Sequence, residues 1–316
     1  MIDSIDMSGL QSAREHLFAH AREIKGFPSG LRLESGVNLV VGPNGSGKST
    51  LLAMLAAGCG CVASSAPTVS LQTVRESFGL LDDVFRLQGL DVRHDGQVLY
   101  VSSRPDLQIE NLRGSDDLGE VWAGFAKRAN LRSSSGETTQ RIMWRALELL
   151  YQAALPDGEI VDVEAQVRAR AEKRKKAFSE KELADLRHKI EEEAWSSGKR
   201  PKAVFPVAQD LLRSAAVNEV WQRRAEIYRQ ALFAPKIEPS KPTIILDEPD
   251  AALDLPKQAR LWSLLASPEV AKRYQVIVAS HSPFAFMAAR KNGNIHLIEM
   301  KAGYAGEVMA SMSNLL

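Results

Sequence analysis

Short apolar runs and amphipathic runs alternate along most of this chain. Runs of β-branched and apolar residues are typical of buried parallel strands, and they occur at 37–41, 243–246 and 274–279. Further strands are expected at 31–33, 97–102, 295–299 and 306–309, the last two as a hairpin that closes the domain. Helices are predicted at 51–57 and 138–153, the second with apolar residues spaced to form one face. This alternation predicts an α/β head built on a central sheet with parallel strands.

The stretch 158–240 follows a different pattern. Its first part, Val163 to Trp195, is dense in charges of both signs and has few apolar positions, which predicts a solvated helix. A turn is expected at 196–201, followed by an amphipathic helix from Pro206 to Leu232. We therefore predict a helical hairpin that projects from the head. The chain then divides into a first part of the head, a helical insertion and a second part of the head, at 1–157, 158–240 and 241–316.

The glycine-rich stretch 42–50, Gly-Pro-Asn-Gly-Ser-Gly-Lys-Ser-Thr, lies between a predicted strand and a predicted helix. That order is typical of a phosphate-binding loop, in which glycines let successive N–H groups surround a polyphosphate at the positive end of a helix. A glycine-rich turn that binds nothing is the alternative, and the strand and helix disfavour it. Lys48 adds a charge near the outer phosphates, the Ser49 hydroxyl suits Mg²⁺, and Thr50 suits an inner phosphate. The predicted nucleotide-binding residues are Gly42, Asn44, Gly45, Ser46, Gly47, Lys48, Ser49 and Thr50.

An acidic pair follows the strand predicted at 243–246. Asp247 and Glu248 stand at its carboxyl end, the side of a parallel sheet that faces the ligand. We expect Asp247 to hold Mg²⁺ and Glu248 to polarise the attacking water. Neighbouring carboxylates also suit the capping of a following helix, an alternative that the glycine loop makes less attractive.

A histidine follows the strand predicted at 274–279. His281 is placed to donate a hydrogen bond to the terminal phosphate, although a single histidine is more often a plain surface or core residue. The candidate catalytic residues are therefore Lys48, Glu248 and His281.

A serine-rich segment, Ser133 to Glu137, precedes the helix predicted at 138–153. Hydroxyl groups and a glycine at a helix amino terminus form a second anion site. Ordinary helix capping explains the same residues equally well.

Together and in this order, the four motifs resemble the ABC-type ATPase head, the nucleotide-binding domain shared by ABC transporters and by chromosome-maintenance and recombination ATPases. The resemblance covers most of the chain outside 158–240. GPNGSGKST, SSSGE in place of LSGGQ, DEPDAALDLP and SHSPF resemble the RecF-like and OLD-like "AAA family ATPase" branch in particular. The resemblance implies an α/β P-loop NTPase fold, with a mixed sheet flanked by helices and with 31–33 and 37–41 in its antiparallel part.

The resemblance also implies a mechanism. Two heads would sandwich ATP and Mg²⁺, each nucleotide held by the loop of one subunit and sealed by Ser134 and Gly136 of the other. Asp254 matches the segment through which the two sites communicate. The family's glutamine that joins Mg²⁺ to the attacking water has three candidates, Gln72, Gln97 and Gln108, and none is assigned.

Composition limits the partners. A formal net charge of +1 argues against a uniformly basic, nucleic-acid-binding surface but leaves a local basic patch open. Apolar runs are short and interrupted, so no membrane span is expected. The acidic stretch 1–6 lacks the pattern of a signal peptide, which predicts a cytoplasmic protein. Cys59 and Cys61 have no histidine nearby, so we expect two reduced thiols rather than a metal site.

Three roles are open for the predicted hairpin. The basic segment 168–176, with Lys199, Arg200 and Lys202 expected at the hairpin tip, suits the phosphate backbone of a nucleic acid. The acidic run 191–193 suits a merely solvated helix surface. A protein-binding arm is the third role.

For function, we expect ATP binding and hydrolysis coupled to dimerisation and opening of the heads, in a soluble DNA-repair, recombination or phage-defence complex. OLD-like nucleases carry a second catalytic domain after the head, and this chain ends shortly after His281, so a separate effector subunit is the expected partner of the homodimer or higher oligomer. One alternative is the ATPase subunit of an ABC transporter, which the long insertion and the DEPD and SHSPF forms disfavour. The other is an ATP-switched binding module with negligible turnover, which Glu248 disfavours.

Overall fold

The computed structural model describes residues 1–11, 19–59, 90–95, 98–102, 135–173, 178–203, 241–251 and 253–314. Several predictions of the sequence lie outside these residues: the helix at 206–232, the three candidate glutamines, Cys61 and Ser134. Within the described part of the chain, no helix is both long enough and apolar enough to cross a membrane.

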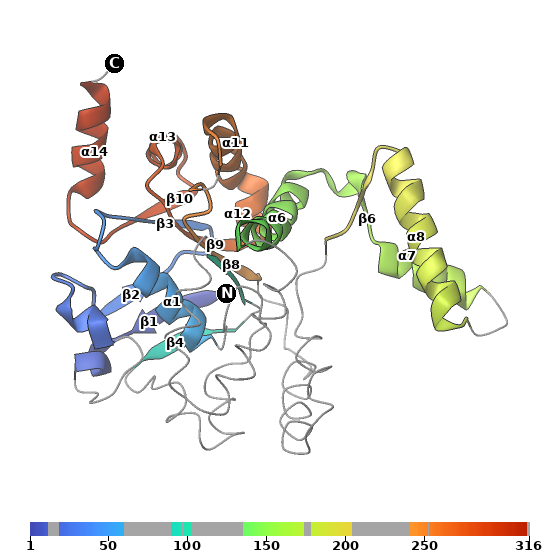
Figure 1. Ribbon diagram of the computed structural model, residues 1–316, viewed down its shortest axis with the longest axis horizontal. Coiled ribbons are helices and arrows are strands. Elements are labelled where there is room, and N and C mark those ends of the chain that lie inside the picture. The colour runs from blue at the N-terminus through green and yellow to red at the C-terminus, as the bar shows by residue number, and fades with distance from the viewer. Residues whose placement is uncertain are drawn as a thin grey trace.

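Five parallel strands form the central sheet (Figure 1). In chain order they are β3 (Val37–Val41), β5 (Val98–Ser102), β8 (Thr243–Asp247), β9 (Gln275–Ala279) and β10 (Ile295–Glu299). Their spatial order is β10-β3-β9-β8-β5, so the glycine-loop strand, the histidine strand and the acidic strand are neighbours. The carboxyl ends of β3, β9 and β8 therefore meet at one edge, as predicted. The expectation that 37–41 belongs to an antiparallel part is wrong, because β3 pairs in parallel with both β9 and β10.

A separate antiparallel sheet lies beside the first. It has the order β2-β1-β4 and consists of β1 (Ile2–Asp6), β2 (Gly30–Arg32) and β4 (Asp91–His94), with the short helices η1 (Ser8–Gln11) and η2 (Ala19–Glu23) between β1 and β2. The buried Gln275 amide on β9 joins the two sheets. It accepts from Ile2 N at 2.7 Å and donates to Ile2 O at 2.7 Å and to Glu34 O at 2.9 Å. A fully bonded buried amide fixes the position of β1 on the parallel sheet.

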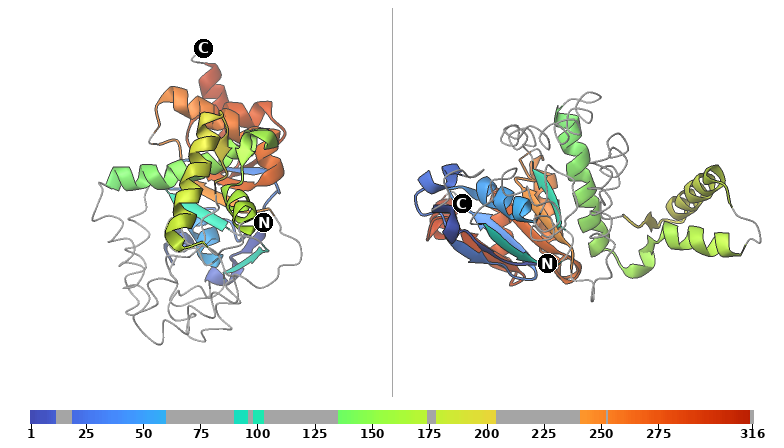
Figure 2. Two further views of the ribbon diagram at one scale, coloured as in Figure 1. Left: turned by 90° about the vertical axis from the view of Figure 1, so that its right-hand side faces the viewer. Right: turned by 90° about the horizontal axis from the view of Figure 1, so that it is seen from below.

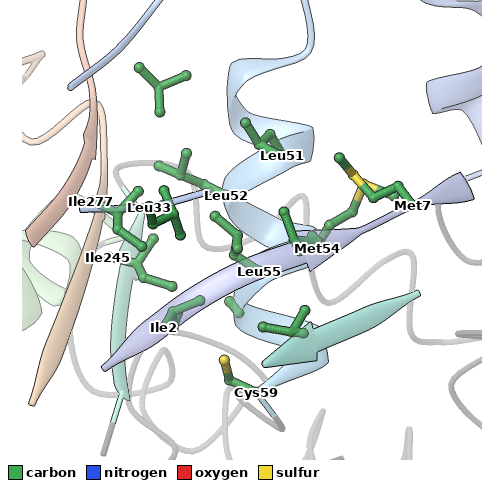
Figure 3. Close-up of a cluster of buried hydrophobic side chains, with 14 of the residues drawn as sticks. Ile2, Met7, Leu33, Leu51, Leu52, Met54, Leu55, Cys59, Ile245 and Ile277 are labelled. Atoms are coloured by element: carbon green, nitrogen blue, oxygen red, sulfur yellow. The ribbon is translucent and has the colours of Figure 1, made fainter. Parts of the chain in front are cut away.

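Alternate side chains of the parallel strands enter two hydrophobic clusters, one on each face of the sheet. Val40, Ile245 and Ile277 belong to the cluster that holds α1 (Lys48–Gly58) and β1 (Figure 3). Side chains of the opposite face pack against four helices: α6 (Ser135–Ala154), α11 (Leu255–Leu265), α12 (Pro268–Arg273) and α13 (Pro283–Lys291). A parallel sheet covered by helices on both faces confirms the predicted P-loop NTPase fold.

Two helices, α7 (Val163–Glu172) and α8 (Glu180–Ser196), lie away from the central sheet (Figures 1 and 2). Their shared core is small and contains the buried side chains of Val163, Val167 and Ile190. The prediction of one helix over 163–195 is wrong, because α7 ends before Ser179 begins a new helix. Ser179 and Glu182 form a capping box, in which each side chain accepts from the other residue's backbone N–H.

The α7–α8 pair begins and ends at one place. After the short helix η3 (Asp157–Glu159), β6 (Ile160–Val161) pairs in parallel with β7 (Arg200–Pro201), and the Gln152 side chain of α6 bonds to Pro201 O and Ala203 N. Lys199, Arg200 and Lys202 were expected at the hairpin tip, and this is wrong. They lie at the base of the α7–α8 pair, where Lys202 Nζ is 2.9 Å from Asp162 Oδ2. The domain boundaries at 157 and 240 stay predictions.

The segment after β10 is a helix. The strand predicted at 306–309 is wrong, because these residues lie within α14 (Tyr304–Ser313), and β10 pairs in parallel with β3 instead of forming a terminal hairpin. Helix propensity explains the difference: Ala and Met recur through this segment, and both favour helix over strand. A left-handed Gly303, with φ of 78°, starts the helix.

Candidate nucleotide-binding site

The loop between β3 and α1 depends on glycine. Gly45 and Gly47 have φ of 78° and 87°, which only glycine adopts readily. A Cβ on Gly47 would lie 2.7 Å from Cε2 of the Phe27 ring, so a side chain there would have to displace that ring. Asn44 and Gly45 are exposed, whereas Gly42 is buried. The chain therefore presents a close backbone turn at the amino end of α1, as predicted.

Ser46 tests whether this loop fits a phosphate group. Its Oγ is buried and, among the described residues, has no hydrogen-bond partner. Leaving a buried hydroxyl unsatisfied costs about 1–3 kcal/mol, so an acceptor from outside the chain would stabilise the loop. A phosphate oxygen is such an acceptor, and the loop residues therefore fit a polyphosphate.

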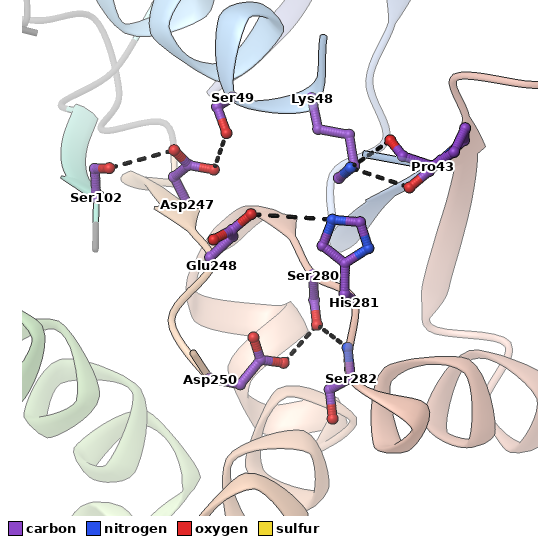
Figure 4. A network of polar contacts seen from close by, with 11 residues as sticks. Pro43, Lys48, Ser49, Ser102, Asp247, Glu248, Asp250, Ser280, His281 and Ser282 are labelled. Atoms are coloured by element: carbon purple, nitrogen blue, oxygen red, sulfur yellow. Dashed lines mark hydrogen bonds and ion pairs between the residues drawn. The ribbon is translucent and has the colours of Figure 1, made fainter. Parts of the chain in front are cut away.

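Lys48 is buried, with 5% of its surface exposed. Its Nζ donates to Gly42 O and Pro43 O, both at 3.0 Å (Figure 4). Burial lowers the pKa of Lys48, and the charges of Glu248 and Asp247 oppose that shift. A cation held by neutral carbonyls in a desolvated place is suited to an incoming anion.

Asp247 ends β8 and accepts two hydroxyl hydrogen bonds. Ser49 Oγ donates to Oδ1 at 3.0 Å, and Ser102 Oγ donates to Oδ2 at 3.2 Å (Figure 4). Hydroxyl and carboxylate oxygens are ligands that Mg²⁺ prefers, so Ser49 and Asp247 fit the predicted metal role. Ser102 was missed by sequence reasoning, although its place at the carboxyl end of a strand was the available signal.

The capping alternative for the acidic pair is wrong. Asp254 caps α11 instead: its carboxylate accepts from Lys257 N at 2.9 Å and lies 2.7 Å from Lys257 Nζ. The hydrogen bond from Lys257 lowers the pKa of Asp254 below its ordinary value. Asp247 and Glu248 are thus left to face the site.

Glu248 has an unusual backbone. Its φ of 51° is the one left-handed value among the described non-glycine residues, a conformation that costs about 1–3 kcal/mol and is common at functional sites. Its N–H donates to Ala279 O at 3.0 Å, which holds the residue against the end of β9. From there, Oε1 lies 3.9 Å from Nε2 of His281 (Figure 4). The two side chains are 18% and 34% exposed, so they face each other at a place that water reaches.

Thr50 contacts a residue that lies outside the sequence motifs. Thr50 Oγ1 lies 3.2 Å from Nε2 of the exposed His20 in η2. His20 was missed by sequence reasoning, because it lies in a short segment without a recognisable pattern. The contact of Thr50 with a phosphate stays a prediction.

The structure does not test the roles of the remaining predicted residues. Gly136 lies in the first turn of α6, which begins at Ser135 rather than at the predicted 138, and Ser134 lies outside the described residues. The roles of Ser134, Gly136 and Asp254 across a dimer stay predictions.

The α7–α8 pair carries opposite charges in contact. Arg170 Nη2 lies 2.6 Å from Glu193 Oε2, and Arg187 Nε lies 2.6 Å from Glu164 Oε1. These pairs neutralise part of the basic segment and favour a solvated helix surface there. The nucleic-acid role of the hairpin stays a prediction.

Comparison with solved structures finds low similarity. The chain is similar to a dimeric ATP-binding cassette, MJ0796, in a post-hydrolysis state bound to ADP and Pi, with 20% identity, coverage of 87% of this chain and 85% of that chain, and a TM-score of 0.30. It is also similar to an SmcHead bound to the C-winged helix domain of ScpA, with 16% identity, coverage of 96% and 95%, and a TM-score of 0.31. No curated protein matches the chain.

A family model provides the stronger comparison. The model described as an AAA domain matches residues 22–232, more than half of the chain, and this range contains the glycine loop and α6. The sheet that carries the glycine loop, the acidic pair and His281 agrees with that match. On this basis, the chain belongs to the AAA domain family.

Proposed function

We propose that this protein binds ATP together with Mg²⁺ and hydrolyses it. The observation that carries the proposal is the meeting of three strand ends, which brings the glycine loop, Asp247 and the facing pair Glu248 and His281 to one edge of the sheet. Desolvation strengthens electrostatic interactions at such an edge, and phosphoryl transfer depends mainly on positioning and electrostatics.

The binding roles follow from the contacts. Lys48 exchanges the carbonyls of Gly42 and Pro43 for the outer phosphate oxygens. Ser46 donates its unsatisfied hydroxyl to a phosphate oxygen. Ser49 and Asp247 would hold Mg²⁺, which when bound neutralises phosphate charge.

The chemical roles fall to the facing pair. Glu248 orients the attacking water and accepts its proton, for which a partly exposed carboxylate is suited. His281 donates a hydrogen bond to the terminal phosphate and stabilises the charge that develops there.

The assembly completes the proposal. Two copies sandwich the nucleotides, with Ser134 and Gly136 of one copy closing the loop of the other, and with Asp254 between the two sites. The helix amino terminus at Gly136 supports this arrangement, because such ends bind anions. From the resemblance of its motifs to RecF-like and OLD-like ATPases, we assign the dimer to a DNA-repair, recombination or phage-defence complex with a separate effector subunit.

Phosphate release by the purified protein tests the proposal. We expect turnover with Mg²⁺ and none with excess chelator. Glu248→Gln should reduce turnover at least about 100-fold without loss of ATP binding. It should also form an ATP-dependent dimer, measured by light scattering after size exclusion.

The matched control is Glu269→Gln, which changes an exposed acid on α12 and should leave turnover unchanged. Absence of phosphate release from the wild type would refute the enzymatic part of the proposal. A monomer of Glu248→Gln at saturating ATP and Mg²⁺ would refute the sandwich.

A further inference from the structure

A buried carboxylate lies next to residues 280–282, which connect β9 to α13 and are called the His281 loop below. Asp250, in the turn that follows Glu248, is 5% exposed. Its Oδ2 accepts from Trp262 Nε1 at 3.0 Å. It also accepts from the hydroxyl of the buried Ser280 (Figure 4). Ser280 Oγ accepts in turn from Ser282 N at 2.9 Å. Asp250 therefore holds a hydroxyl that bonds across His281, from the residue before it to the residue after it.

Gln258 on α11 makes a second connection between the same two segments. Its Nε2 donates to Asp250 O at 3.1 Å and to Leu253 O at 3.0 Å. Its Oε1 accepts from Ser282 Oγ at 2.9 Å, and Ser282 is the N-cap residue of α13. One amide thus bridges the carbonyls of Asp250 and Leu253 and the start of α13.

We infer that Asp250 and Gln258 are positioning residues that tie the His281 loop to the turn after Glu248. The catalytic consequence rests on the proposed function, because it requires His281 to contact the phosphate. A buried carboxylate is stable only when its oxygens are hydrogen-bonded, so Asp250 holds Ser280 firmly. Movement of Asp250 or Leu253 is then passed to the neighbours of His281 through two side chains as well as through the backbone.

The tie also relates His281 to the predicted dimer contact. Leu253, whose carbonyl accepts from Gln258, directly precedes Asp254. A partner subunit that presses on Asp254 would displace this carbonyl and, through Gln258, Ser282. Closure of the dimer would thereby set the distance between His281 and Glu248.

Core stabilisation alone is the competing explanation. It predicts that loss of Ser280 or Gln258 lowers stability without a specific effect through His281. The positioning role predicts that loss of Ser280 or Gln258 lowers kcat only while His281 is present. A double-mutant cycle separates the two explanations.

The test measures turnover and ATP affinity of Ser280→Ala and Gln258→Met, each alone and combined with His281→Ala. We expect each single change to lower kcat about tenfold with the Kd for ATP altered less than about twofold. In the His281→Ala background, each should lower kcat by less than about twofold. The inference would be overturned if each change lowered kcat by the same factor in the His281→Ala background as in the wild type. Unchanged kcat in the single variants would also overturn it. Ser263→Ala, an exposed serine on α11, is the matched control and should change neither quantity.

A second measurement does not depend on activity. Hydrogen exchange of the backbone amides of residues 280–282 and 284 should become about tenfold faster in Gln258→Met, because the Ser282 contact is lost. Unchanged hydrogen exchange in Gln258→Met would contradict the positioning role even if the protein hydrolyses ATP. Faster exchange in a protein without ATPase activity would instead support the tie and refute the proposed function. Should Ser280→Ala fail to fold, Gln258→Met carries the test, because Gln258 is partly exposed.

Discussion

The carboxyl edge of the parallel sheet and the α7–α8 pair use the same kinds of charged residue in opposite ways. At the edge, Lys48 and Asp247 are 5% and 4% exposed and bond to backbone or hydroxyl groups. In the helix pair, Arg187 and Glu164 have side chains 43% and 46% exposed and bond to each other. Charges removed from water interact strongly, whereas hydrated charges are screened. Substitutions at the edge should therefore alter function, and those on the helix pair should alter little beyond local stability.

Lys48→Ala should give the largest effect. Removing the buried cation of the loop should weaken ATP binding at least about 100-fold, because charge-assisted contacts to phosphate are lost. Equilibrium binding of a fluorescent ATP analogue measures the change. Lys272→Ala, an exposed lysine on α12, is the control. Equal ATP affinity of Lys48→Ala and the wild type would contradict the expectation that substitutions at the sheet edge alter function.

Ile190→Ala comes next and acts on the other region. Ile190 is 1% exposed in the small core of α7 and α8, so its truncation should destabilise that pair by about 2–4 kcal/mol. Hydrogen exchange of the α7 and α8 amides reports this local loss, while ATP affinity should be unchanged. Weaker ATP binding by this variant would mean that the helix pair and the site are coupled.

Glu164→Gln should have a small effect that depends on pH. The hydrogen bond from Arg187 holds the pKa of Glu164 below its ordinary value, so the pair stabilises the fold above that value. The contribution is lost as the pH falls through the folded pKa. We expect a difference of less than about 1 kcal/mol between wild type and variant at pH 7, which disappears in acid once the pH is below the folded pKa of Glu164. Exchange rates in α7 at pH 7 and in acid measure it, with Glu172→Gln as the exposed control. A difference that grows on acidification would contradict this sign.

Removal of the α7–α8 pair should have the smallest effect on the site. β6 and β7 are adjacent, so a glycine-serine linker of about six residues can replace 162–199. ATP affinity and turnover should stay within about twofold of the wild type. Circular dichroism confirms folding of the shortened chain. A folded variant that no longer binds ATP would show that the arm supports the head.

Sequence reasoning succeeded where chemistry requires neighbouring residues. The glycine loop, the Asp247–Glu248 pair and His281 each follow a strand, so position along the chain gave their place in space. Ser102 and His20 come from distant segments, and only tertiary pairing brings them to Asp247 and Thr50.

The wrong predictions have local causes. The helix predicted over 163–195 missed the capping box at Ser179 and Glu182, which was present in the sequence as a start signal. The strand predicted at 306–309 rested on a run too short to separate strand from helix.

Glu248 places activity and stability in conflict at one position. Its left-handed backbone suits glycine or asparagine better than glutamate, so the general base stands where the fold would choose another residue. Variation without selection for turnover should drift toward those residues and gain thermal tolerance as the chemistry disappears. The identity of this single residue would then distinguish working copies of the domain from copies kept only for assembly.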